Sequence, residues 1–246
     1  MKRDSGSRKL SVMMLLFGLA ALALRTGLYA AAVDARGLLL RGHPLTIALA
    51  VLSAAVLTIA ALSTRKIKAT GVYEDHYRAD LPSALGCAAA GAGILATVLA
   101  GTPVTGSYLE KIWLFLGLAS PVCLLLAAAA RVLGKRPFFL LHVVVCLFFV
   151  LHIVTRYQFW SSQPQMQDYL FSLLGAMALM FFGFYKASLE AGLGDLRMTL
   201  GTGLAAIYLC IGELARSSCP LLYLGGILWV LTDLFSIRNV FSHEEK

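Results

Sequence analysis

Five ionisable residues at or near the ends of apolar stretches are the side chains of this sequence best suited to chemistry. They are Arg25, His152, Arg156, Asp168 and Glu213. A charged side chain at bilayer depth costs about 2.5–3.5 kcal/mol even on insertion scales, so each needs a structural or functional reason. Guanidinium groups suit bidentate binding of carboxylate or phosphate. We therefore predict that these five residues bind substrate.

Each of these residues also has a plainer interpretation. Arg156 precedes Tyr157 and Trp160, and an arginine beside aromatic residues at a helix end is often an interfacial anchor. Glu213 is either a structural counter-ion or a proton-coupling carboxylate, depending on whether an arginine lies near it. His152 and Asp168 are the plausible acid–base groups if the protein is an enzyme.

Known catalytic and metal-binding patterns do not extend this set. The sequence has no GxSxG elbow, HExxH pair or Walker A loop. His142 and His152 are ten residues apart, about 15 Å along a helix, so they cannot bind one metal ion by themselves. We interpret His142 as a packed histidine, and we assign no catalytic residue, metal or cofactor.

The composition identifies the solvent in which these groups must work. The chain of 246 residues is 59% hydrophobic and 14% charged, whereas about 25% charged is usual for a globular domain. The formal charge of +8 does not indicate nucleic-acid binding, because the basic residues are scattered between apolar runs, where they act as topology signals. The lipid bilayer is the expected partner.

Eight apolar runs are long enough to position these residues as membrane-spanning helices. We predict an all-α fold, a polytopic helical bundle that forms a single transmembrane domain over residues 1–246. The first run could instead be a cleaved signal peptide, since a basic start precedes it and Ala30–Ala32 ends it; a retained helix is the favoured interpretation. The predicted spans are 10–33, 44–62, 83–101, 112–132, 138–156, 168–187, 198–214 and 220–237.

Charge distribution and small residues add detail to this bundle. Eight spans place 15 of the 21 Lys and Arg residues on the side of the N-terminus, which predicts that both termini are cytoplasmic and that the protein lies in the cytoplasmic membrane of a cell. In the third span Ala84, Ala88 and Ala92 are spaced by four. Small residues at this spacing predict close helix contact and a central position for that span.

The topology places Arg25, His152, Arg156 and Glu213 toward the outer ends of their spans, with Asp168 near the same level. A small-solute transporter or binding protein with an outward-facing polar vestibule is therefore the leading hypothesis, and its arginines favour an anionic solute. The first alternative is a non-catalytic structural or regulatory subunit that binds a membrane protein partner. The second is a membrane-embedded enzyme acting on lipid, with His152 or Asp168 as its acid–base group.

Overall fold

A computed structural model of the chain describes residues 5–33, 39, 42–65, 67, 73–77, 80–101, 108–160 and 169–237. Regular secondary structure in this part is helical, apart from an isolated bridge between Val33 and Leu39. The helices are α1 (Ser5–Ala31), α2 (Pro44–Thr64), α3 (Tyr73–His76), α4 (Leu81–Ala100), α5 (Tyr108–Val132), α6 (Leu140–Trp160), α7 (Leu170–Glu190), α8 (Leu196–Glu213), the 3₁₀ turn η2 (Leu214–Arg216) and α9 (Pro220–Ser236).

The predicted membrane bundle is confirmed, since each of the eight predicted spans corresponds to one long helix. Seven of these helices are long and apolar enough to cross a membrane. The eighth, α9, is apolar and has 17 residues, which gives it a length of about 25 Å at 1.5 Å per residue. A helix is the expected form of each run, because lipid offers no hydrogen-bond partner to an open backbone.

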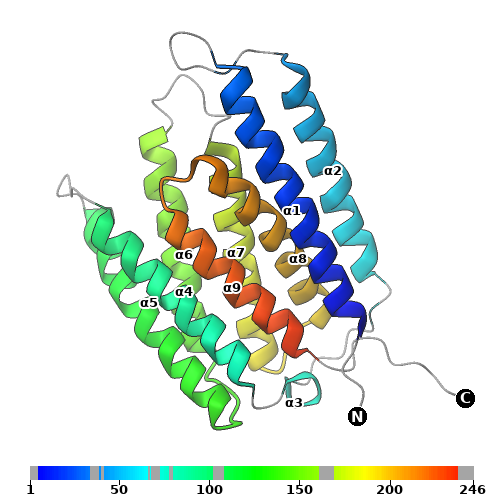
Figure 1. The fold of residues 1–246 in the computed structure, drawn as a ribbon. Helices are drawn as coiled ribbons and strands as arrows, with labels where there is room; N and C mark the ends of the chain where they lie inside the picture. The colour runs from blue at the N-terminus through cyan, green and yellow to red at the C-terminus, as the bar shows by residue number, and fades with distance from the viewer. Residues whose placement is uncertain are drawn as a thin grey trace, which may run out of the picture.

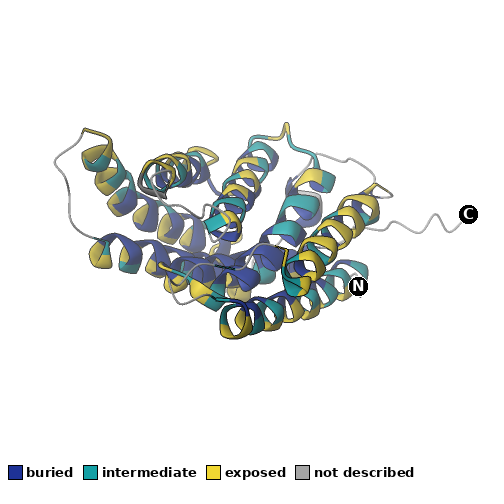
Figure 2. Ribbon diagram, turned by 90° about the horizontal axis from the view of Figure 1, so that it is seen from above, coloured by how far each residue is buried: buried dark blue, intermediate teal, exposed yellow. Residues whose placement is uncertain are grey.

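The long helices form a ring of six, with two further helices outside it (Figure 1). Around the ring, α4, α5, α6, α7, α8 and α9 each pack against their neighbours, and α9 packs against α4. Helix α1 lies against α8 and α9, and α2 lies against α1 and α8. Viewed from above, the buried residues face the middle and the exposed residues face outward (Figure 2).

The outward surface is apolar, as a lipid-facing surface must be. Leu16, Val51, Leu99, Phe115 and Leu133 are each more than half exposed. A soluble protein rarely exposes contiguous apolar surface on this scale. The protein is therefore a multi-pass membrane protein whose outer surface contacts the bilayer.

The closest helix contact in the ring joins α4 to α9 and depends on glycine. A Cβ atom added to Gly93 would lie 2.3 Å from the Leu221 carbonyl oxygen, and one added to Gly225 would lie 2.7 Å from that of Ala89. Helix α4 makes the close contact that its small residues predict, but it lies in the ring with an exposed outer face rather than at the centre, and the face used differs from the predicted one. Ala92, one of the three alanines expected at the contact, is exposed.

The two ends of the bundle differ in charge. We call the end at which α1 begins the proximal end and the opposite end the distal end. Helix α3 and the last turns of α2, α5, α7 and α9 lie at the proximal end (Figure 1). Most of the described Lys and Arg residues lie there, and the distal end holds Arg25, Lys111, Arg156 and Arg216. The cytoplasmic orientation of the proximal end stays a prediction.

Candidate functional site

Arg25 and Glu213 form a buried ion pair between α1 and α8 near the distal end. Nη1 of Arg25 lies 2.9 Å from Oε2 of Glu213, and each side chain is 3% exposed. The guanidinium also donates to the Gly212 carbonyl oxygen at 2.8 Å and to the Tyr29 hydroxyl at 3.2 Å. Its Cζ lies 4.7 Å from the centre of the Phe171 ring. Groups of the protein therefore enclose this arginine.

The local structure of α8 explains why an arginine is held at this point. The Gly212 carbonyl belongs to the last turn of α8, where carbonyl groups lack intrahelical partners. A cation there also interacts favourably with the helix dipole. The absence of a side chain at Gly212 permits the close approach of Phe171, since an added Cβ would lie 2.7 Å from that ring.

His152 and Arg156 lie one turn apart on α6 but in different surroundings. His152 is 2% exposed and packs against Trp113 and Phe148, with ring centroids 6.3 and 5.8 Å away. Its Nδ1 has no hydrogen-bond partner among the described residues. Arg156 is half-buried and lines a cavity. Asp168 lies outside the described residues.

Of the four predicted residues that the structure describes, Arg25 and Glu213 lie together, whereas His152 and Arg156 lie in other surroundings. Arg25 and Glu213 form a pair with each other, whereas Arg156 makes no hydrogen bond or ion pair with either of them. The assignment of all five residues to substrate binding stays a prediction. Of those that the structure describes, Arg156 lines a cavity.

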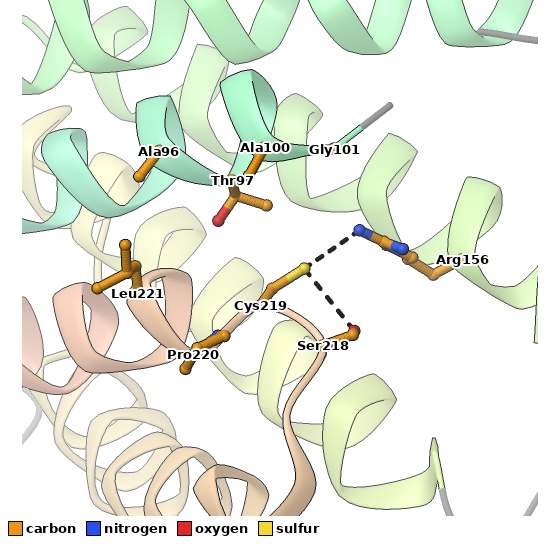
Figure 3. A pocket seen from close by; sticks show the side chains of 9 residues that line it. All are labelled: Ala96, Thr97, Ala100, Gly101, Arg156, Ser218, Cys219, Pro220 and Leu221. Carbon is orange, nitrogen blue, oxygen red and sulfur yellow. Dashed lines mark hydrogen bonds between the residues drawn. The ribbon is translucent and has the colours of Figure 1, made fainter. Parts of the chain in front are cut away.

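The cavity beside Arg156 has a volume of about 400 Å³ and lies between α4, α6 and the start of α9 (Figure 3). The guanidinium points at Cys219, and its Nη2 donates to the sulfur at 3.1 Å. The Ser218 hydroxyl donates to the same sulfur at 3.8 Å. The residues that line the cavity are Ala96, Thr97, Ala100, Gly101, Arg156, Ser218, Cys219, Pro220 and Leu221.

The polar groups on the wall of this cavity are a guanidinium, a thiol and hydroxyl groups. A guanidinium has five N–H donors, and a thiol sulfur is a weak acceptor. No carboxylate in the described part of the chain pairs with Arg156. The Thr97 hydroxyl already donates to the Gly93 carbonyl oxygen at 2.8 Å, but its oxygen retains acceptor capacity. The cavity thus offers a cation with which no described carboxylate pairs, and small apolar walls.

A second polar cluster, near the proximal end, is centred on Asp233 of α9. This carboxylate accepts hydrogen bonds from Lys186 Nζ at 2.8 and 3.1 Å and forms an ion pair with Arg131. Tyr77 and Ser83 donate to it at 3.2 and 3.1 Å. Asp233 and Lys186 are fully buried. The cluster therefore joins α4, α5, α7 and α9 to the segment that carries α3.

Aromatic rings from that segment cover the cations of this cluster. Lys186 Nζ lies 3.3 Å from the centre of the Tyr77 ring and 5.4 Å from that of Tyr73. The Arg131 guanidinium lies 5.3 Å from the Tyr77 ring. Burial raises the pKa of Tyr73 and Tyr77 above the ordinary value, so both phenols remain protonated and Tyr77 can donate to Asp233.

A third buried pair lies beside this cluster. His142 Nδ1 is 2.7 Å from Glu190 Oε2, and both side chains are fully buried. The imidazole also stacks on Trp229, with ring centroids 5.8 Å apart. Among the described residues the second nitrogen of His142 and the second oxygen of Glu190 have no hydrogen-bond partner.

The proximal cluster is the feature that the sequence hypothesis missed. Arg131 and Lys186 were interpreted as topology charges, although Lys186 falls inside the apolar span predicted over 168–187. Asp233 lies inside the span 220–237, and a buried aspartate requires a counter-ion. That requirement was the available signal, but it does not identify the partner. The described residues contain no group of three or more His, Cys, Asp or Glu side chains that could hold a metal ion.

Comparison of the chain with protein families, with curated proteins and with solved structures found no match. The function must therefore be inferred from the geometry itself.

Proposed function

We propose that this membrane protein binds a small anionic group, a carboxylate or a phosphate, in the distal cavity beside Arg156. The observation that carries the proposal is the Arg156 guanidinium on the wall of a cavity of about 400 Å³, where no carboxylate among the described residues pairs with it. Ligand cavities in proteins typically measure about 300–1,000 Å³ and hold a few polar groups among apolar walls. Arginine is the residue best suited to bidentate contact with such anions.

Binding fits the bundle better than passage of the solute through it. The core of the bundle, between the cavity beside Arg156 and the cluster around Asp233, contains large, fully buried side chains, among them Phe148, Phe182 and Trp229. The Arg25–Glu213 pair is enclosed by protein groups and does not border the cavity. The same packed interior supports the second candidate, a non-catalytic subunit of a membrane complex, for which an anion in this cavity would be dispensable.

The test is anion binding to the purified protein in nanodiscs of phosphatidylcholine. Inorganic phosphate, acetate and glycerol 3-phosphate serve as soluble probes, and thermal unfolding reports binding because a ligand of the folded state raises the unfolding temperature. We expect stabilisation by at least one probe in the wild type, its loss in Arg156→Gln and partial retention in Arg156→Lys. Arg216→Gln removes an exposed arginine from the same end and serves as the control.

A second set of nanodiscs distinguishes a soluble ligand from a lipid headgroup. If phosphatidylglycerol stabilises the wild type in an Arg156-dependent way and the soluble probes do not, the anion is a lipid headgroup. If Arg156→Gln responds to every probe and to phosphatidylglycerol as the wild type does, the proposal is wrong and the subunit hypothesis leads.

A further inference from the structure

A second cavity, unrelated to Arg156, lies near the proximal end between α2 and α8. Its volume is about 380 Å³. Leu57, Ala60 and Ala61 of α2 line one wall, and Gly201 and Ala205 of α8 line the other. The small side chains on both walls leave the space between the two helices unfilled. Helix α2 packs mainly against α1 and α8 and lies outside the ring, so this groove lies at the outside of the bundle.

Two arginines stand at the proximal end of this groove. Arg65 is the C-cap residue of α2 and is exposed, and Arg197 lies in the first turn of α8. Arg197 Nη2 donates to the Ile67 carbonyl oxygen at 3.2 Å, whereas its buried Nε has no hydrogen-bond partner among the described residues. Both arginines line the same cavity as the apolar walls.

The described acidic side chains form no ion pair with these two arginines, Arg65 and Arg197. The carboxylate nearest in sequence, Asp195, caps α8 by accepting the backbone N–H of Arg197 at 2.8 Å. The groove therefore combines apolar walls with two guanidinium groups whose N–H groups can donate further hydrogen bonds.

We infer that this groove binds an anionic phospholipid, with an acyl chain along the small residues of α2 and α8 and the phosphate at Arg65 and Arg197. The position suits such a ligand, because both arginines lie at the ends of membrane-spanning helices, where lipid headgroups are found. Basic pockets between such helices bind anionic headgroups, and arginine contacts phosphate in a bidentate geometry. The inference is independent of the proposed function, because the two sites share no residue and lie at opposite ends.

The test uses protein exchanged into a mixture of phosphatidylglycerol and phosphatidylcholine. Native mass spectrometry then measures how much of each lipid stays bound to the protein. We expect the wild type to retain one phosphatidylglycerol molecule in preference to phosphatidylcholine. The double variant R65Q/R197Q should lose this preference about tenfold or more, since each basic residue near a membrane surface contributes about 1 kcal/mol to anionic lipid attraction. The matched control K9Q/K135Q removes two exposed charges from the same end and should keep the preference.

A second variant tests the groove without changing any charge. Ala61 is exposed and lines the groove, so Ala61→Phe should fill the space without disturbing the packed core and should also lose the bound lipid. Equal losses in the two double variants, or full retention in Ala61→Phe, would overturn the inference. Arg156→Gln should retain the lipid, so this site and the distal anion site can fail separately.

Discussion

The guanidinium of Arg25 and the carboxylate of Glu213 lie 2.9 Å apart, although 188 residues separate them in the sequence. The pair ties the first membrane helix to the six-helix ring at α8. Because both groups are buried, the Glu213 carboxylate depends on the arginine for compensation of its charge. The pair is a buried contact that holds α1 against the ring, and the assignment of both residues to a substrate-binding vestibule stays a prediction.

Breaking this pair should therefore destabilise the protein. Arg25→Gln removes the ion-pair partner of the buried Glu213 carboxylate, which typically costs about 3–5 kcal/mol. Glu213→Gln removes the carboxylate from the arginine and should also lower the stability. The double variant R25M/E213L should be more stable than either single variant, because it removes both charges together. Reversible unfolding in detergent measures the free energies of the double-mutant cycle. Single variants as stable as the wild type would show that the pair is not needed for packing α1.

The proximal cluster should respond to substitution in a graded way. Asp233→Asn leaves Arg131 and Lys186 adjacent without their carboxylate, and we expect a loss of about 3–5 kcal/mol. Tyr77→Phe removes one hydrogen bond to that carboxylate but keeps the ring over Lys186, so it should cost only about 1.5 kcal/mol. Reversible unfolding in detergent measures the free energy of unfolding of each variant. A larger loss of stability in Tyr77→Phe than in Asp233→Asn would contradict the central role of Asp233.

The contact of α4 with α9 should tolerate no side chain at Gly93. A Cβ atom there would lie 2.3 Å from a backbone carbonyl oxygen, so Gly93→Ala forces the helices apart and should cost at least about 1–3 kcal/mol. Ala92→Leu adds more atoms to the same helix but on an exposed position, and it should be nearly neutral. Thermal unfolding compares the stabilities of the two variants. Equal stabilities would show that α4 does not approach α9 closely at Gly93.

Cys219 should report on the distal cavity through its reactivity. It is buried, like Cys87, Cys146 and Cys210, but it lines the cavity and accepts a hydrogen bond from Arg156, whereas the other three do not line that cavity. A small anionic methanethiosulfonate should modify Cys219 fastest, as measured by mass spectrometry of peptides. Arg156→Gln should slow that reaction, since it removes the cation that attracts the reagent. Equal rates at all buried cysteines would indicate that the cavity is closed to small anions.

The orientation in the membrane is a prediction that fusions can test. Because most Lys and Arg residues fall on the side of the N-terminus, a fluorescent protein fused to the C-terminus should fold and fluoresce in the cytoplasm. Alkaline phosphatase at the same position should be inactive there. The reverse pattern would invert the bundle and place the Arg156 cavity on the cytoplasmic side.

The number and approximate position of the long helices follow from the sequence alone. An apolar run of about 20 residues in lipid can satisfy its backbone only as a helix, and this rule needs no knowledge of neighbouring segments. The excess of Lys and Arg residues at one end of the bundle also follows from the sequence. Successive connections between membrane-spanning helices must lie on alternate sides, so the basic residues on each side can be counted. For the same reason the sequence alone places Arg25, His152, Arg156 and Glu213 near one level of the bundle.

Tertiary structure alone decided which groups meet. When every face of a helix is apolar, the sequence does not show which face packs against a neighbouring helix. For this reason Ala92 was predicted to lie at the contact with another helix, whereas in the structure Gly93 makes that contact. Pairing of charges depends on that rotation and on which helices are neighbours. The side chains of Lys186 and Asp233 are 47 residues apart in the chain and join only because α7 and α9 belong to one ring. Arg156 is left with an open cavity for the same reason, since its helix neighbours present a thiol and small side chains rather than a carboxylate.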